Sequence, residues 1–92
     1  MIKSFGDKST ESLFAGRCPR RWLSIRARAE RKLILVHAAH TLDFLRSPPG
    51  NRLEALRGDR KGQHSIRIND QWRVCFRWTE GDAYDVEIVD YH

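Results

Sequence analysis

Residues 66–92 read IRINDQWRVCFRWTEGDAYDVEIVDYH, and this stretch decides the fold. Apolar and polar side chains alternate with a period of two, which is typical of strands that have only one face on a core. The apolar side chains share even positions, and they are Ile66, Ile68, Trp72, Val74, Phe76, Trp78, Tyr84, Val86 and Ile88. We therefore predict strands at about 63–68, 72–78 and 84–91.

The pairing of these strands follows from parity. Direct cross-strand partners lie on the same face, so even positions must pair with even positions. Both hairpin loops must then hold an odd number of residues, and the simplest choices are residues 69–71 and 80–82. The predicted pairs are Ile68 with Trp72, Ile66 with Val74, Arg67 with Arg73, Trp78 with Tyr84, Phe76 with Val86 and Arg77 with Asp85.

Arg67 and Arg73 therefore converge on the polar face of the predicted sheet. Arginine forks match the oxygens of phosphate, so one interpretation is a phosphate clamp. The alternative is that the two side chains separate or bind carboxylates such as Glu87. Arg77 and Asp85 are expected to form an ordinary surface ion pair.

The first half of the chain is predicted to be helical. Asp7 can cap a short helix to residue 15, which Gly16 is placed to end. The strongest helix spans about 20–40, and its apolar stripe recurs at steps of three and four at Trp22, Ile25, Ala29, Leu33 and Val36. Residues 1–5 are expected to pair with the later sheet, Thr41 to cap a helical turn at 42–45, and 52–57 to form a strand.

These elements predict a single α+β domain over residues 1–92. We expect a small, twisted antiparallel sheet with two N-terminal helices packed on one face. The turn-forming residues 47–51 separate helices from strands, but neither side has enough apolar surface to fold alone.

Charge is unevenly distributed along the chain. The total is +5, but residues 1–79 carry 17 Lys and Arg against seven Asp and Glu, a net +10, and residues 80–92 carry five acids and no base. A basic small domain favours a nucleic-acid or ribosome partner, because neutralising phosphates releases counterions. The alternative is a soluble domain with a solvated basic face.

Cys18 and Cys75 lack C-x-x-C spacing, and the chain shows neither a signal peptide nor a long apolar run. These features predict a cytoplasmic protein that does not bind membranes. His37 and His40 are three apart on the predicted helix, but no cysteine or carboxylate follows at motif spacing. We therefore expect no metal site and no cofactor.

The stretch ends on three side chains that can transfer protons or hold a neighbour, Asp90, Tyr91 and His92. Glu54 and Arg57 are expected on an adjoining strand, near Arg73. Such a set could cleave RNA without a metal: one group deprotonates a ribose 2′-OH, arginines hold the phosphate charge, and another group protonates the leaving 5′ oxygen. A polar strand end without function is the alternative.

Four segments carry a family resemblance: PPGNRLE at 48–54, LRGDR at 56–60, QHSIRINDQWR at 63–73 and VEIVDYH at 86–92. With MIKSF at 1–5, the chain resembles HigB-type toxins of the RelE/ParE superfamily, in the branch that includes GraT-like proteins. The resemblance implies a RelE-like fold and a type II toxin. It implies cleavage of mRNA on the translating ribosome and inhibition by a HigA-like helix-turn-helix antitoxin, through which alone operator DNA is contacted.

Residue by residue, Arg73, Asp90, Tyr91 and His92 match the family's active-site region. Glu54 stands where some members have a catalytic histidine, and Arg57 stands where lysine is common. The predicted catalytic set is therefore His92, Asp90, Tyr91, Glu54 and Arg73. The predicted RNA or phosphate contacts are Arg57, Arg67, Lys61, Arg60 and His64.

Three functions remain open from the sequence. The first is a ribosome-dependent endoribonuclease that inhibits translation. The second is a ParE-like toxin that binds and poisons DNA gyrase, against which the proton-transferring chain end argues. The third is a non-catalytic module that binds RNA or the ribosome, which the charge alone would allow.

Overall fold

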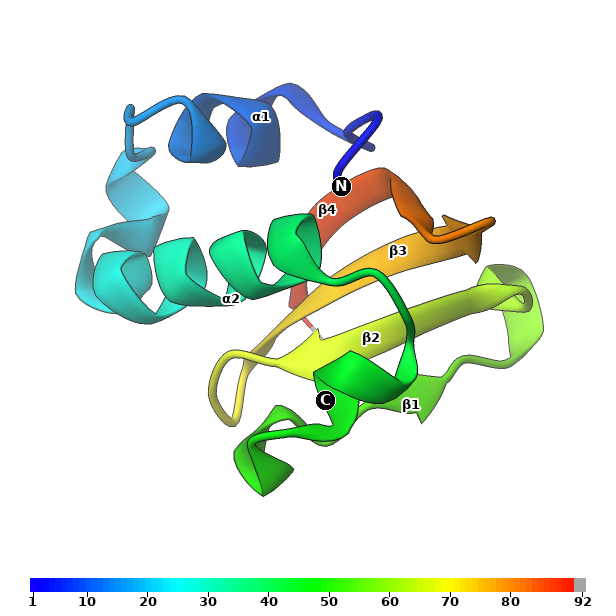
Figure 1. The fold of residues 1–92 in the computed structure, drawn as a ribbon. Coiled ribbons are helices and arrows are strands. Elements are labelled where there is room, and N and C mark those ends of the chain that lie inside the picture. Colours follow the sequence, from blue (N-terminus) through cyan, green and yellow to red (C-terminus); the bar gives the residue numbers. More distant parts are fainter. Residues whose placement is uncertain (91–92) are drawn as a thin grey trace.

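The structure is a computed structural model that describes residues 1–90. A four-stranded antiparallel sheet in the order β1-β2-β3-β4 is covered by two α-helices, so the predicted α+β architecture is confirmed. The strands are β1 Glu54–Ala55, β2 Gln63–Arg67, β3 Trp72–Thr79 and β4 Asp82–Asp90. Figure 1 shows α1 and α2 on one side of the curved sheet.

Helix α1 spans Lys8–Phe14 and begins as predicted, because the Asp7 carboxylate accepts a hydrogen bond from the Thr10 backbone N–H at 2.8 Å. Helix α2 spans only Arg26–Ala38. Residues Arg20–Ile25 form the 3₁₀ helix η1, so the prediction of one helix from residue 20 was wrong at its start. A separate 3₁₀ segment after Pro19 still turns Trp22 and Ile25 into the core.

Three further 3₁₀ turns connect the helices to the sheet, namely η2 Asp43–Arg46, η3 Pro49–Asn51 and η4 Gly58–Arg60. The Thr41 hydroxyl accepts a hydrogen bond from the Phe44 N–H at 3.2 Å, which confirms the predicted cap. The predicted strand at 52–57 is shorter than expected, since only Glu54 and Ala55 pair with β2.

The first hairpin has the predicted register, with Arg67 opposite Arg73 and Ile66 opposite Val74. The second hairpin does not. Its loop holds two residues, Glu80 and Gly81, because Thr79 pairs with Asp82. Both loop residues have positive φ, at 49° and 84°, as a tight turn that matches the twist of the strands requires.

A β-bulge restores the parity that this short turn breaks. The register shifts so that Asp85 and Val86 together lie opposite Phe76, with Asp85 at φ 53°. Beyond the bulge Val86 and Ile88 return to the core face, but Ala83 replaces Tyr84 as the inward residue before it. The predicted pairs Trp78–Tyr84 and Arg77–Asp85 were therefore wrong, although Arg77 and Asp85 still form an ion pair at 3.3 Å.

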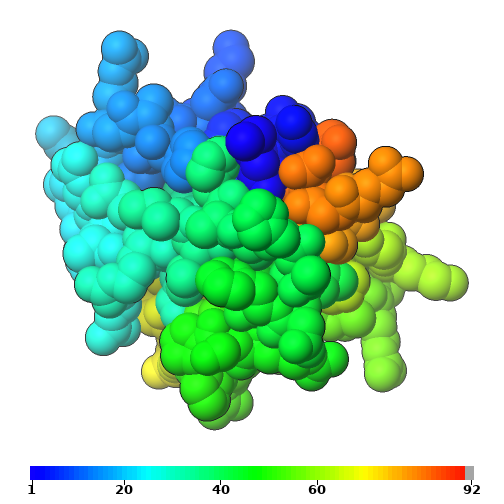
Figure 2. All heavy atoms as spheres, in the orientation of Figure 1, coloured from blue at the N-terminus to red at the C-terminus, as the bar shows by residue number. Residues whose placement is uncertain are grey.

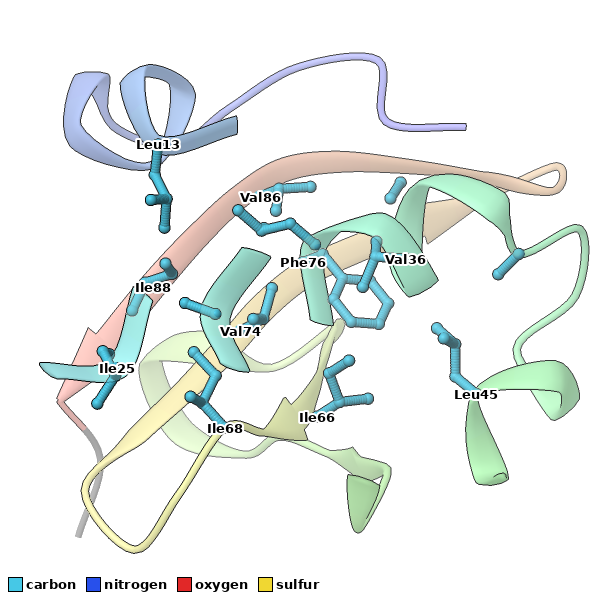
Figure 3. Close-up of a cluster of buried hydrophobic side chains, with 14 of the residues drawn as sticks. Leu13, Ile25, Val36, Leu45, Ile66, Ile68, Val74, Phe76, Val86 and Ile88 are labelled. Atoms are coloured by element: carbon cyan, nitrogen blue, oxygen red, sulfur yellow. The ribbon is translucent and has the colours of Figure 1, made fainter. Parts of the chain in front are cut away.

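The core lies between the helices and the even-numbered face of the sheet (Figure 3). The α2 stripe is buried as predicted, and Leu33 and Val36 are fully inaccessible to solvent. Residues 1–6 run alongside β4, with parallel bridges from Ile2 to Ala83 and from Phe5 to Val86. The expected pairing of the N-terminal segment with the sheet is confirmed. Neither α-helix in residues 1–90 combines the length and apolar character that a bilayer crossing needs.

Candidate active site

The candidate site lies on the face of the sheet that points away from the helices, which we call the polar face. The register places Glu54 opposite Ser65, Ser65 opposite Cys75 and Cys75 opposite Glu87. Arg73 lies one pair further along the same face. Paired residues share a face, so four strands contribute to one polar surface.

The side chain of Arg73 is buried beneath the polar face. Its side chain is only 8% exposed. Nε donates to the Ser65 hydroxyl at 2.7 Å, and Nη2 donates to the carbonyl oxygens of Arg52 at 2.5 Å and Ser65 at 3.3 Å. Arg52 itself has a left-handed backbone conformation, with φ 45°. The guanidinium is therefore fixed in place before any ligand arrives.

Glu54 places a carboxylate beside the guanidinium of Arg73. Its Oε1 lies 3.9 Å from Arg73 Nη2, and its side chain is 51% exposed. The pair thus combines a buried cation with a carboxylate that solvent or a substrate can reach. A carboxylate in that position can accept a proton while the guanidinium stabilises nearby negative charge.

Arg67 does not join Arg73 in a clamp. The two residues are direct partners in the β2–β3 ladder, but Arg67 forms an ion pair with Asp70 in the hairpin loop, while Arg73 turns toward Ser65. The paired guanidiniums thus separate, which is the alternative that the sequence left open. Repulsion between the two guanidiniums is reduced because each binds separate acceptors, Asp70 for Arg67 and Ser65 with Arg52 for Arg73.

Arg60 crosses the polar face from η4. Its guanidinium lies 2.6 Å from a Glu87 carboxylate oxygen and donates to Gln63 Oε1 at 3.0 Å. The thiol of Cys75 is buried on the same face. Burial raises its pKa, and Glu87 adds to that rise, while Arg60 and Arg73 oppose it. A raised pKa keeps the thiol protonated and makes it a poor nucleophile.

The remaining predicted phosphate contacts are dispersed. Arg57 and Lys61 are exposed on either side of η4. His64 lies on the other face of the sheet, where its ring stacks on Phe76 with centroids 6.4 Å apart and an interplanar angle of 25°. His64 Nδ1 is buried without a hydrogen-bond partner among the described residues. The structure therefore does not bring His64 to the polar face.

The chain end is described only in part. Asp90 pairs with Trp72, so its side chain belongs to the even-numbered side, and it accepts a hydrogen bond from Gln71 Nε2 at 3.1 Å. Tyr91 and His92, also predicted to be catalytic, lie outside the described residues. Of the predicted catalytic residues within 1–90, Arg73 and Glu54 are brought together, and Asp90 lies at the end of β4.

Sequence reasoning missed the groups that hold Arg73. Ser65 and the Arg52 carbonyl fix the guanidinium, yet neither was chosen as a site residue. Ser65 could have been found, because it is a small polar residue two residues before Arg67 and therefore on the same face of the strand. The Arg52 carbonyl could not, since its direction depends on the turn after η3. No cluster of three or more potential metal ligands occurs within residues 1–90.

Comparison with known proteins places this chain in a family. Residues 3–92 match the model of the RelE-like toxin of the type II toxin–antitoxin system HigB. Toxin HigB-1 of Vibrio cholerae serotype O1 is 41% identical over 85 residues, which are 90% of each chain. Endoribonuclease HigB of Proteus vulgaris is 44% identical over 41 residues, or 45% of each chain.

A solved structure shares the fold. The YoeB–YefM complex from Staphylococcus aureus contains a chain that superimposes with a TM-score of 0.60 at 14% identity, covering 100% of this chain and 98% of that one. This similarity concerns the fold alone, whereas the family model extends over nearly the whole sequence. The chain belongs to the HigB family of RelE-like toxins of type II toxin–antitoxin systems.

Proposed function

We propose that this toxin is an endoribonuclease that cuts mRNA on the translating ribosome and so inhibits translation and growth. The observation that carries the proposal is the fixed pair of Arg73 and Glu54, a buried cation beside an accessible carboxylate. The name of the related Proteus vulgaris protein, Endoribonuclease HigB, supports the same activity.

The proposed reaction uses the ribose of the substrate as nucleophile and needs no metal. Glu54 takes the proton of the 2′-OH, the 2′ oxygen forms a bond to phosphorus, and the bond from phosphorus to the 5′ oxygen breaks. The fixed guanidinium of Arg73 stabilises the negative charge that develops on the phosphate. Tyr91 or His92 protonates the leaving 5′ oxygen. The products are a 2′,3′-cyclic phosphate and a 5′-OH.

The small number of groups that residues 1–90 bring to the site supports dependence on the ribosome. A single fixed guanidinium with one carboxylate cannot orient a flexible RNA strand, and orientation accounts for a large part of catalysis. The net charge of +10 on residues 1–79 favours binding to ribosomal RNA, with Arg57, Arg60, Lys61 and Arg67 as the candidate RNA or phosphate contacts.

The partners and the location follow from the same proposal. We expect a HigA-like antitoxin with a helix-turn-helix domain, operator DNA bound only through that antitoxin, and no contact with membranes. A target on the ribosome requires the toxin to act in the cytoplasm.

Primer extension on cellular mRNA after induction tests the activity. Wild-type toxin should produce new 5′ ends within translated regions. Glu54→Gln should reduce cutting by about 10²-fold or more, the range for loss of an acid–base group. Glu11→Gln removes an exposed carboxylate on α1 and should cut like the wild type.

Two outcomes would reject the proposal. Absence of new 5′ ends at toxic levels of wild-type protein would exclude the nuclease. If purified toxin instead inhibits supercoiling by DNA gyrase, a gyrase poison would replace it. Full cutting by a toxin lacking His92 would leave the nuclease standing but remove His92 from the mechanism.

A further inference from the structure

A second cationic feature lies away from Glu54 and the buried Arg73. It is a surface hollow of about 250 Å³, which we call the basic hollow. Its lining residues are Arg28, Arg31, Lys32, Gly50, Arg67 and Ile68. In Figure 2 the yellow atoms around the β2–β3 turn reach the surface between α2, in cyan, and the green segment that contains η3. Arginines of α2 thus meet an arginine of β2 around the hollow.

The charges of the basic hollow repel one another. Partial burial lowers the pKa of Lys32, and the neighbouring charges of Arg31, Arg67 and Arg28 lower it further. None of the lining residues is acidic. Within residues 1–90, the carboxylate paired with a lining residue is that of Asp70, whose side chain is 98% exposed, so water screens much of its charge. An anion in the hollow would relieve this repulsion.

The hollow is also held in shape. Asn51 is fully buried, and its amide donates to the carbonyl oxygens of Leu45 at 3.1 Å and Ser47 at 3.2 Å. The side-chain oxygen of Asn51, Oδ1, accepts a hydrogen bond from the Lys32 ammonium. The ammonium is therefore fixed by a neutral group, which does not compensate its positive charge.

We propose that the basic hollow binds a backbone phosphate of the RNA strand other than the phosphate that is cut. This inference rests on the proposed function for its RNA partner. Several guanidinium forks and an ammonium suit the oxygens of a phosphate. Arg67 lies directly opposite Arg73 in the ladder, so one RNA strand can reach both the basic hollow and the candidate active site.

A double variant tests the proposal. Arg28→Gln with Arg31→Gln removes two exposed charges of the hollow, and Arg17→Gln with Arg20→Gln removes two exposed charges elsewhere. The probe is a single-stranded 12-nucleotide RNA with 2′-O-methyl groups, which cannot be cut through its 2′-OH. Fluorescence anisotropy should show roughly 10-fold or greater weakening for the hollow variant. Its salt dependence should fall by a slope of about 0.7 per lost phosphate contact. The control should bind within about two-fold of the wild type.

Three results would overturn the proposal. Equal weakening by both double variants would mean that only net charge matters. Inorganic phosphate binding that depends on Arg28 and Arg31, with RNA affinity unchanged, would make the hollow a site for free ions. Weaker binding of purified antitoxin, again with RNA affinity unchanged, would assign the hollow to a protein contact.

The test is independent of cleavage. Wild-type protein that cuts mRNA while the hollow variant binds the methylated RNA normally would refute the inference and leave the proposed function intact. Wild-type protein that does not cut would refute the function whatever the binding result. Thermal unfolding of both double variants within a few degrees of the wild type excludes misfolding as the cause.

Discussion

Arg73 and the basic hollow differ in the exposure of their positive charges and in the groups that bind them. Arg73 is 8% exposed and bound by a hydroxyl, two carbonyl oxygens and a nearby carboxylate. The basic hollow places four cations around an open space, and its buried support is the neutral amide of Asn51. The first arrangement satisfies its charge within the protein, and the second leaves its charge for a ligand.

The two arrangements suit different roles, since a fixed cation can stabilise charge in a reaction and an open group of cations can bind an anionic ligand. A guanidinium that already has its acceptors contributes a fixed field to a reaction, because it needs no rearrangement when charge develops. Cations without acidic neighbours contribute affinity, which salt weakens. Substitutions at the two places should therefore affect different measurements.

Arg73→Ala should have the largest effect. It leaves a cavity and removes the donor from Ser65 and the Arg52 carbonyl, so the free energy of unfolding should fall by about 2–4 kcal/mol. Cleavage should be lost. Arg73→Lys keeps the charge but not the fork, and it should fold better than Arg73→Ala while cutting poorly. Urea unfolding and primer extension measure both. Arg77→Ala, an exposed arginine on the same strand, is the matched control; equal losses there would contradict the role of burial.

Ser65→Ala should have the next largest effect. The Arg73 Nε would lose its 2.7 Å acceptor in a buried site, which costs roughly 1–3 kcal/mol. Cleavage should fall about 10-fold because the guanidinium is less well fixed, while binding to the methylated RNA should not change. Ser24→Ala removes an exposed hydroxyl and serves as control. Wild-type cleavage by Ser65→Ala would show that the hydroxyl does not position Arg73.

Asp70→Asn should act on the hollow alone. It removes the carboxylate paired with Arg67, so affinity for the methylated RNA should rise by about two- to five-fold at low salt. Stability should change by less than about 0.5 kcal/mol, because the pair is largely solvated. Asp43→Asn, which also breaks an exposed pair with a nearby arginine, should leave RNA affinity unchanged.

Lys32→Met should reveal the smallest effect, a difference in pH dependence. The pKa of Lys32 is lowered in the folded state from its ordinary value of 10.5. Between the lowered value and 10.5 the unfolded chain retains a proton that the folded chain has lost, so wild-type stability should rise with pH relative to Lys32→Met. Urea unfolding of both proteins from pH 7 to pH 10.5 measures the difference. A gap that stays constant over this range would mean that neither burial nor the neighbouring arginines lower the pKa of Lys32 in the folded state.

Much of the fold was predictable because hydrophobic periodicity is a local property. The stripe on α2 and the alternation of β2 and β3 identified the core face correctly. The second hairpin was not predictable by parity, because parity assumes an unbroken ladder. A tight Glu80–Gly81 turn and a bulge at Asp85 together satisfy the same burial.

The candidate site was predictable in its residue types but not in its contacts. The sequence indicated Arg73 and Glu54, and the structure brings them within 3.9 Å. It also suggested that Arg67 and Arg73 act together, because they are cross-strand partners. The separation of their side chains depends on acceptors from the η3 turn and the hairpin loop, which no pattern in β2 or β3 contains.

Local pattern predicted the α+β class, the core face and the placement of Arg67 opposite Arg73, since alternation and burial constrain these along each strand. The burial of Arg73 against Ser65 and Arg52, and the position of Arg67 beside α2 at an open hollow, depend on how distant segments pack. A charged side chain binds whatever acceptors surround it, and those acceptors come from segments that are distant in sequence. The stretch 66–92 therefore predicted where Arg67 and Arg73 would lie, but not which groups these two arginines would bind.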